Sequence, residues 1–183
     1  AVPIENNASI ETKGFEISLS WSDKIGKVTY HARGVLSNYK GKVLKYPNPT
    51  TLLTTWYPGM TMGEIWGYVT KGIYQSDEEI SKGPDQSKIY GAQWTPGDVQ
   101  YKDLDGNNSI DWGDYTAKKP GDMKVIGNST PQYSYGLSLG AEYQGFDLSV
   151  FLQGVAKRDA WISSNMFWGI VPGGAPEWQS SVF

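Results

Sequence analysis

Two neighbouring stretches decide the fold: QYSYGLSLGAEY at residues 132–143 and FDLSVFLQ at residues 146–153. In the first stretch, apolar or aromatic residues alternate with small or polar ones. A period of two is the pattern of a β-strand with one apolar and one polar face. Only Gln144 and Gly145 separate the stretches, and glycine supplies the positive φ that a two-residue hairpin loop needs. The sequence therefore predicts an antiparallel hairpin, with the second strand reaching about residue 157.

Two earlier stretches show the same alternation and predict two more strands. They cover residues 14–22 and 27–39, joined by a short turn at residues 23–26. The apolar face of the first of these strands is formed by Phe15, Ile17, Leu19 and Trp21. Together the four strands predict a mainly β fold, with an antiparallel sheet that is apolar on one side and polar on the other.

The connection between the second and third strands, residues 40–131, is far longer than the usual loop of about 4–6 residues. Tight turns at one end of a sheet and a long connection at the other are typical of outer-membrane β-barrels. Strands of about nine to thirteen residues also match the roughly 9–11 that cross a bilayer at a tilt. A soluble sandwich with one large insertion fits the periodicity equally well, so both architectures stay open on this evidence.

The composition excludes several classes of protein. The chain has 183 residues, 16 Lys+Arg against 19 Asp+Glu, a single histidine and no cysteine. Disulfides, thiol nucleophiles and zinc sites built from cysteines are excluded, as is a metalloenzyme with a histidine pair. No cluster of Lys and Arg is present, which argues against a nucleic-acid partner. No apolar run approaches the roughly 18 residues of a membrane helix.

The ends of the sequence suggest a fragment. It begins at Ala1 without an initiator Met, a signal segment or a lipidation motif, and it ends at Phe183 without a closing element. Four strands are also too few for an outer-membrane barrel, which begins at about eight. We therefore expect a partial barrel rather than a complete domain.

An acidic stretch, DLDGNNSIDWGD at residues 103–114, predicts a calcium site. Its oxygen-bearing side chains fall at the ligand positions of an EF-hand loop. The predicted ligands are Asp103, Asp105, Asn107, Ser109 through its backbone carbonyl, Asp111 and Asp114. Ile110 stands at the apolar anchor position, and Asn108 replaces the usual glycine with a residue that tolerates the left-handed conformation. Because no helix pair flanks the loop, we expect a structural Ca²⁺ ion; the alternative is a solvated acidic turn.

Other local signals are weaker. Ser76 to Glu79 reads as a capping box, so a short helix should begin there. Two Pro-Gly-Asp turns, at residues 96–98 and 120–122, bracket the acidic stretch. No spacing marks two facing carboxylates, and His31 lies within a strand without a nucleophile-elbow pattern. We therefore predict no catalytic residue and no enzyme.

Several stretches together resemble the SusC/RagA family of TonB-dependent outer-membrane transporters of Gram-negative bacteria. The strongest is VIGNSTP at residues 125–131, followed by Tyr135-Gly136 and by GFDLSVFLQG at residues 145–154. The other matching stretches, in the same order as in the family, are residues 7–17, 63–69 and 96–106. The resemblance covers nearly the whole chain.

The resemblance implies a barrel of about 22 strands with a plug inside. Such a protein lies in the outer membrane, is energised through TonB and imports oligosaccharides or peptides with a SusD-like surface lipoprotein. This chain resembles part of the C-terminal half of the barrel, with residues 40–131 outside the cell. It departs from the family pattern at Asn108, where glycine is usual. The competing hypotheses are a soluble, calcium-stabilised carbohydrate-binding β module and a glycosidase.

Overall fold

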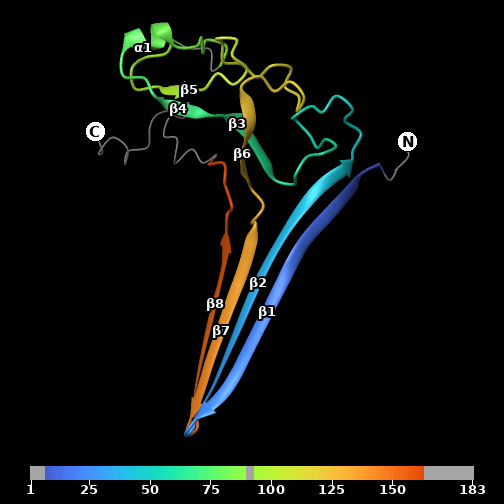
Figure 1. Cartoon of the computed structure of the whole chain (residues 1–183), viewed down its shortest axis with the longest axis vertical. Helices are drawn as coiled ribbons and strands as arrows, with labels where there is room; N and C mark the ends of the chain where they lie inside the picture. The colour runs from blue at the N-terminus through green and yellow to red at the C-terminus, as the bar shows by residue number, and fades with distance from the viewer. Residues whose placement is uncertain (1–6, 90–92, 163–183) are drawn as a thin grey trace, which may run out of the picture.

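The computed structural model describes residues 7–89 and 93–162. Its main element is a four-stranded antiparallel sheet in the order β1-β2-β7-β8 (Figure 1). The strands are β1 (Ser9–Ile25), β2 (Val28–Lys45), β7 (Tyr133–Tyr143) and β8 (Phe146–Ala156). The prediction of a mainly antiparallel β fold is confirmed.

The first hairpin differs from its predicted boundaries. β1 and β2 pair from Ile25↔Val28 to Ser9↔Lys45, with one register shift between Ser9 and Ile10, well beyond residues 14–22 and 27–39. The turn is therefore Gly26-Lys27 and not residues 23–26; Gly26 has a φ of 60°, which favours glycine. The turn at Gln144 and Gly145 agrees with the prediction, with φ values of 49° and 86°.

The long connection begins by returning to β2. The Val43 N–H donates to the Met60 carbonyl at 2.9 Å, and the Val43 carbonyl accepts from Gly59 N–H at 2.8 Å. The Met62 N–H donates to the Gly41 carbonyl at 2.8 Å. These residues take the place beside β2 that β7 occupies nearer the turns. Val43 is completely buried.

The described residues between β2 and β7 form a separate body at one end of the sheet, which we call the platform (Figure 1). It contains two small antiparallel sheets, β3–β6 and β4–β5. Its elements are β3 (Glu64–Tyr68), β4 (Thr70–Ile73), α1 (Asp77–Lys82), β5 (Val99–Tyr101) and β6 (Met123–Asn128).

Helix α1 begins where the capping box predicts. Ser76 Oγ accepts the Glu79 N–H at 3.3 Å, while Glu79 Oε2 accepts the N–H of Gln75 at 2.9 Å, one residue earlier than the motif implies. The helix ends after six residues, where the Gly83 N–H donates to the carbonyls of Glu79 and Ile80. Within the described ranges, no helix has the length and apolar character to cross a membrane.

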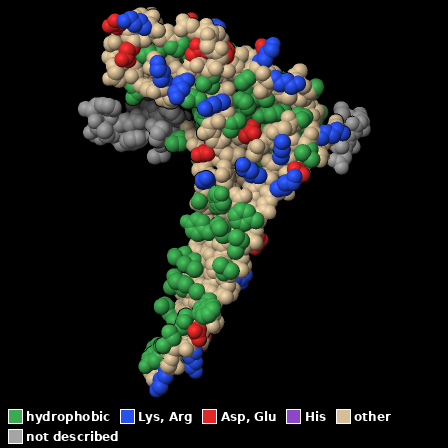
Figure 2. Space-filling view, in the orientation of Figure 1, with side chains coloured by type: hydrophobic (Ala, Val, Ile, Leu, Met, Phe, Trp, Pro, Cys, Tyr) green, Lys and Arg blue, Asp and Glu red, His purple; other side chains and the backbone are tan. Residues whose placement is uncertain are grey.

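The platform contains most of the buried apolar side chains. Among the described residues these are Val43, Tyr57, Tyr74, Ile89, Ile110 and Met123. The four-stranded sheet is different, because it is a single layer; Leu19 is 71% exposed and Phe146 is 81% exposed. Figure 2 shows apolar side chains along the visible surface of the sheet, with charged side chains concentrated on the platform and at the turn end.

Candidate functional site

The acidic loop, residues 103–114, is curled by its own side chains. Asp103 Oδ1 accepts the Gly106 N–H at 2.6 Å, and its Oδ2 accepts the Asn108 N–H at 2.8 Å. Asn108 has a φ of 61°, so it adopts the left-handed conformation that its position in the motif requires. Burial by itself raises the pKa of Asp103, but the N–H groups around its carboxylate outweigh this and lower the pKa. The carboxylate is therefore ionised at neutral pH.

The next two predicted ligands continue the curl. Asp105 Oδ1 accepts the Asn107 N–H at 3.1 Å, and Asn107 Oδ1 accepts the Ser109 N–H at 2.7 Å. The second Asp105 oxygen accepts from Asn107 Nδ2 at 3.0 Å. The Ser109 hydroxyl is buried and has no hydrogen-bond partner in the described part of the chain.

The last two predicted ligands face lysines. Asp111 Oδ2 lies 2.8 Å from Lys88 Nζ, and Asp114 Oδ2 lies 3.4 Å from Lys119 Nζ. The hydrogen bond from Lys88 lowers the pKa of Asp111, and the same contact raises the pKa of Lys88. Each of these two carboxylates thus has a lysine as its charge partner.

Asp122 is the residue that the sequence analysis missed. Its side chain is fully buried; Oδ1 accepts the Leu104 N–H at 2.6 Å and Oδ2 accepts the Asp111 N–H at 2.9 Å. The Asp122 N–H also donates to the Asp111 carbonyl at 2.9 Å. Asp122 therefore joins both ends of the acidic loop to the start of β6. Its only sequence signal is the second Pro-Gly-Asp turn, which we interpreted as a turn alone.

Three carboxylates converge on one point. One oxygen from each of Asp103, Asp105 and Asp122 lies within 4.8 Å of the other two. Calcium binds oxygens at about 2.3–2.6 Å, so two ligands on opposite sides of the ion are about 5 Å apart. The spacing is compatible with one calcium ion; Asp103 and Asp105 belong to the predicted ligands, and Asp122 does not.

The second candidate region is the apolar face of the four-stranded sheet. We use the word rung for four residues that lie opposite one another across β1, β2, β7 and β8. The central rung of this face is formed by Leu19, Gly34, Leu137 and Leu152. The rung nearest the turns is formed by Ile25, Val28, Tyr143 and Phe146, and the one nearest the platform by Phe15, Asn38, Tyr133 and Ala156. Aliphatic residues thus dominate the middle, and aromatic residues stand at both ends.

The same register places one charge on this face, Asp23 between Trp21 and Ile25, and further charges beyond and behind it. On the platform side of the last rung, Lys13 is opposite Lys40. The other face of the sheet carries polar rungs, one of which is Ser22, His31, Gly140 and Ser149. The His31 ring lies over Gly140, where any Cβ would overlap with it. The sheet therefore separates an apolar surface from a polar one.

These features define an antiparallel, single-layered sheet with two unlike faces, continuous with a platform at the end opposite its tight turns. The chain is 27% identical over 164 residues to TonB-dependent receptor P3 of Formosa agariphila. The alignment covers 82% of this chain and 15% of that receptor, so the chain spans a small part of its relative's length. No protein-family model matches the chain. The similarity supports a relationship with TonB-dependent receptors.

Proposed function

We propose that the chain is a segment of a TonB-dependent outer-membrane importer: part of the wall of its barrel, with the platform outside the cell. The apolar face of the sheet carries this proposal. It extends without a charged residue along β7 from Tyr133 to Tyr143, roughly 33 Å of strand at about 3.3 Å per residue. A strand tilt of about 35–45° reduces this to a height near the roughly 25 Å apolar band of such barrels. On β1 the same face carries one charge, Asp23, near the turn. The aromatic end rungs correspond to the two interfacial girdles.

The two edges of the sheet support a larger barrel. In the described residues, β1 pairs only with β2, and β8 pairs only with β7. An open strand edge in hydrocarbon leaves backbone groups without partners, which costs several kcal/mol for each group. Further strands outside this chain would satisfy both edges. TonB and the plug would also be engaged through parts of the protein outside this chain.

The finer assignment is an importer of the SusC/RagA type for glycans or other oligomeric nutrients, working with a SusD-like lipoprotein in a Gram-negative outer membrane. Its support is the resemblance at residues 125–131 and 145–154. The position of the platform, opposite the tight turns, agrees with an external surface that reaches the substrate or the lipoprotein. In this role the chain is part of a transporter and not of an enzyme.

A structural calcium ion in the platform is the second part of the proposal. Asp103, Asp105 and Asp122 would hold it through carboxylate oxygens, which are the ligands that calcium prefers. The ion would offset two of the three converging negative charges and fix the acidic loop against the start of β6. It would have a structural role, because it closes a loop whose ordering is otherwise costly.

The decisive experiment is to express the full-length protein, including any sequence on either side of this chain. We expect it to enter the outer-membrane fraction and to show the slower gel migration of a heat-unfolded barrel only after boiling. A protein that is monomeric and stable in buffer without detergent would instead support the alternative, a soluble calcium-stabilised carbohydrate-binding β module. Hydrolysis of glycans by the purified protein would support a glycosidase.

A further inference from the structure

Two cavities on the platform meet at one lysine. Lys71 is the extra residue of a β-bulge in β4, because Thr70 pairs with Tyr101 whereas Gly72 pairs with Gln100. A bulge redirects the side chain that it carries and is frequent beside binding sites. Lys71 lines both cavities, which have volumes of about 690 and 540 Å³. Both volumes lie within the roughly 300–1,000 Å³ of ligand pockets.

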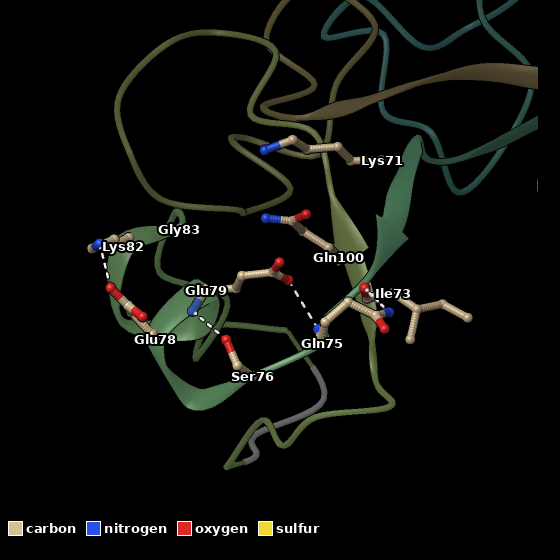
Figure 3. A pocket seen from close by; sticks show the side chains of 9 residues that line it. All are labelled: Lys71, Ile73, Gln75, Ser76, Glu78, Glu79, Lys82, Gly83 and Gln100. Atoms are coloured by element: carbon tan, nitrogen blue, oxygen red, sulfur yellow. Dashed lines mark hydrogen bonds and ion pairs between the residues drawn. The ribbon is translucent and has the colours of Figure 1, made fainter.

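The larger cavity has a polar lining. It lies between the β4–β5 sheet and α1, and Figure 3 shows Lys71 and Gln100 extending from the strands toward the space that Glu79 faces from the helix. Gln75, Ser76 and the ion pair of Glu78 with Lys82 also line it. Carboxylate, carboxamide and hydroxyl groups can exchange hydrogen bonds with a ligand rich in hydroxyls.

The smaller cavity has an apolar wall, formed by Pro84, Tyr101 and Leu104. The Tyr101 ring packs against Tyr68 at 5.4 Å and against Trp94 at 6.3 Å between ring centroids. Its backbone is also fixed, since the Tyr101 N–H donates to the side-chain oxygen of the buried Gln86 at 2.7 Å. The wall is therefore formed before any ligand arrives.

The charge in the smaller cavity is uneven. Lys71 and Lys102 both line it, and within the described ranges neither lysine takes part in a salt bridge. Asp103 is the acidic residue on the lining, and it belongs to the acidic loop. A negatively charged group is therefore attracted toward the two lysines and repelled from Asp103.

We propose that these adjoining cavities bind an acidic oligosaccharide, with one sugar ring against Tyr101 and its carboxylate or sulfate group between Lys71 and Lys102. This inference rests on the proposed function and names the class of substrate. An aromatic and prolyl wall offers apolar contact to the C–H face of a sugar ring. The next sugar residue reaches the polar cavity past Lys71, where Gln100 and Glu79 meet its hydroxyls.

The test is binding of tri-galacturonate and of uncharged galactotriose to the full-length protein in detergent, measured by calorimetry. We expect the acidic trimer to bind more tightly, and Lys71→Gln with Lys102→Gln to weaken its binding at least tenfold. The matched control is Lys118→Gln with Lys124→Gln, which removes the same charge from exposed platform lysines outside both cavities. The control pair should change the affinity less than twofold.

Three results would overturn the inference: equal binding of the two trimers, an equal loss in the control pair, or lysine-dependent binding of an acidic peptide but of neither sugar. The fraction of each variant in the outer membrane is measured in parallel. Normal membrane insertion without acidic-sugar binding contradicts this inference alone. Failure of the wild-type protein to enter the membrane contradicts the proposed function instead.

Discussion

The sheet and the platform use opposite means to become stable. The sheet has the longest strands and the most regular hydrogen bonding, yet its apolar side chains stay exposed; Leu152, for instance, is 55% exposed. The platform has short strands and long loops, yet Tyr74, Ile89 and Ile110 are almost completely buried in it. Regular backbone structure and a hydrophobic core are therefore located in different parts of this chain.

The difference shows what each region needs from its surroundings. The platform buries its own apolar groups and satisfies polar groups such as Asp122 and Gln86 internally. The sheet lacks a covering layer among the described residues, so an apolar solvent on one face is the natural complement to its alternation. The following predictions test this contrast, starting with the largest expected effect.

A charge on the apolar face of the sheet should be the most damaging change. Leu152→Arg places a guanidinium in the central rung, and a cation at the midplane of a barrel costs about 2–4 kcal/mol. The measurement is the free energy of unfolding of the full-length protein in phospholipid vesicles, from a urea titration. Gln153→Arg is the control, because the neighbouring residue lies on the polar face. Equal costs for the two variants would remove the basis for a membrane-facing surface.

A methyl group at Gly63 should loosen the joint between the two regions. Gly63 has a φ of 83°, and an added Cβ would overlap with the side chains of Thr130 and Asn128. Left-handed strain and overpacking together predict a loss of about 3 kcal/mol. Hydrogen exchange should show the loss at β3 and β6, with smaller changes in β7 and β8.

Gly59→Ala isolates the backbone contribution at this joint. Gly59 has a φ of 97° but open space around its Cβ position. We therefore expect only the strain of about 1–2 kcal/mol. If Gly63→Ala costs no more free energy of unfolding than Gly59→Ala, Thr130 and Asn128 make room for the methyl group and do not restrain the joint.

Calcium should stabilise the platform and leave the sheet unchanged. At 100 times its dissociation constant, a ligand of the native state adds about 2.7 kcal/mol. Differential scanning calorimetry with Ca²⁺ and with a chelator measures the gain, and Asp105→Asn should reduce it strongly. Asp77→Asn removes an equal charge from α1 and should keep the gain. An unchanged calcium affinity in Asp105→Asn would refute the site.

The smallest effect should come from the cap of α1. Ser76→Ala removes the side-chain acceptor of the Glu79 N–H, a loss of about 1 kcal/mol. Because the helix is six residues long and exposed, the change should be confined to it. Amide exchange at Glu79 should accelerate, while the exchange of Ile110 stays constant. Acceleration throughout the platform would mean that α1 is part of its cooperative core.

The elements that could be predicted depend on local patterns. Alternation identified the four strands, Gly145 identified the second hairpin, and Ser76 with Glu79 identified the start of α1. The first turn was misplaced because Asp23 and Lys24 look like turn residues, although they pair with Tyr30 and Thr29 in the extended hairpin. Pairing with the neighbouring strand overrode the local preference.

The ligands expected from the sequence and the carboxylates that converge in the structure overlap only in part. The acidic stretch predicts Asp103 and Asp105 as ligands, because the spacing of ligands within one loop can be read from the sequence. Asp111 and Asp114 have the same spacing, but Lys88 and Lys119 pair with them. Which lysine pairs with each of these two aspartates depends on the path of the loop in space, and the spacing along the sequence does not determine that path.

The sequence by itself determined the faces of the sheet, because the side-chain direction along a strand alternates with every residue whatever the rest of the chain does. Only the tertiary structure decided that Asp122 joins Asp103 and Asp105, and that residues 59–62 extend the pairing of β2. The physical reason is that these contacts join segments far apart in the chain through irregular loops. Packing and backbone hydrogen bonds fix the positions of these segments, and the local alternation of residue types does not predict either.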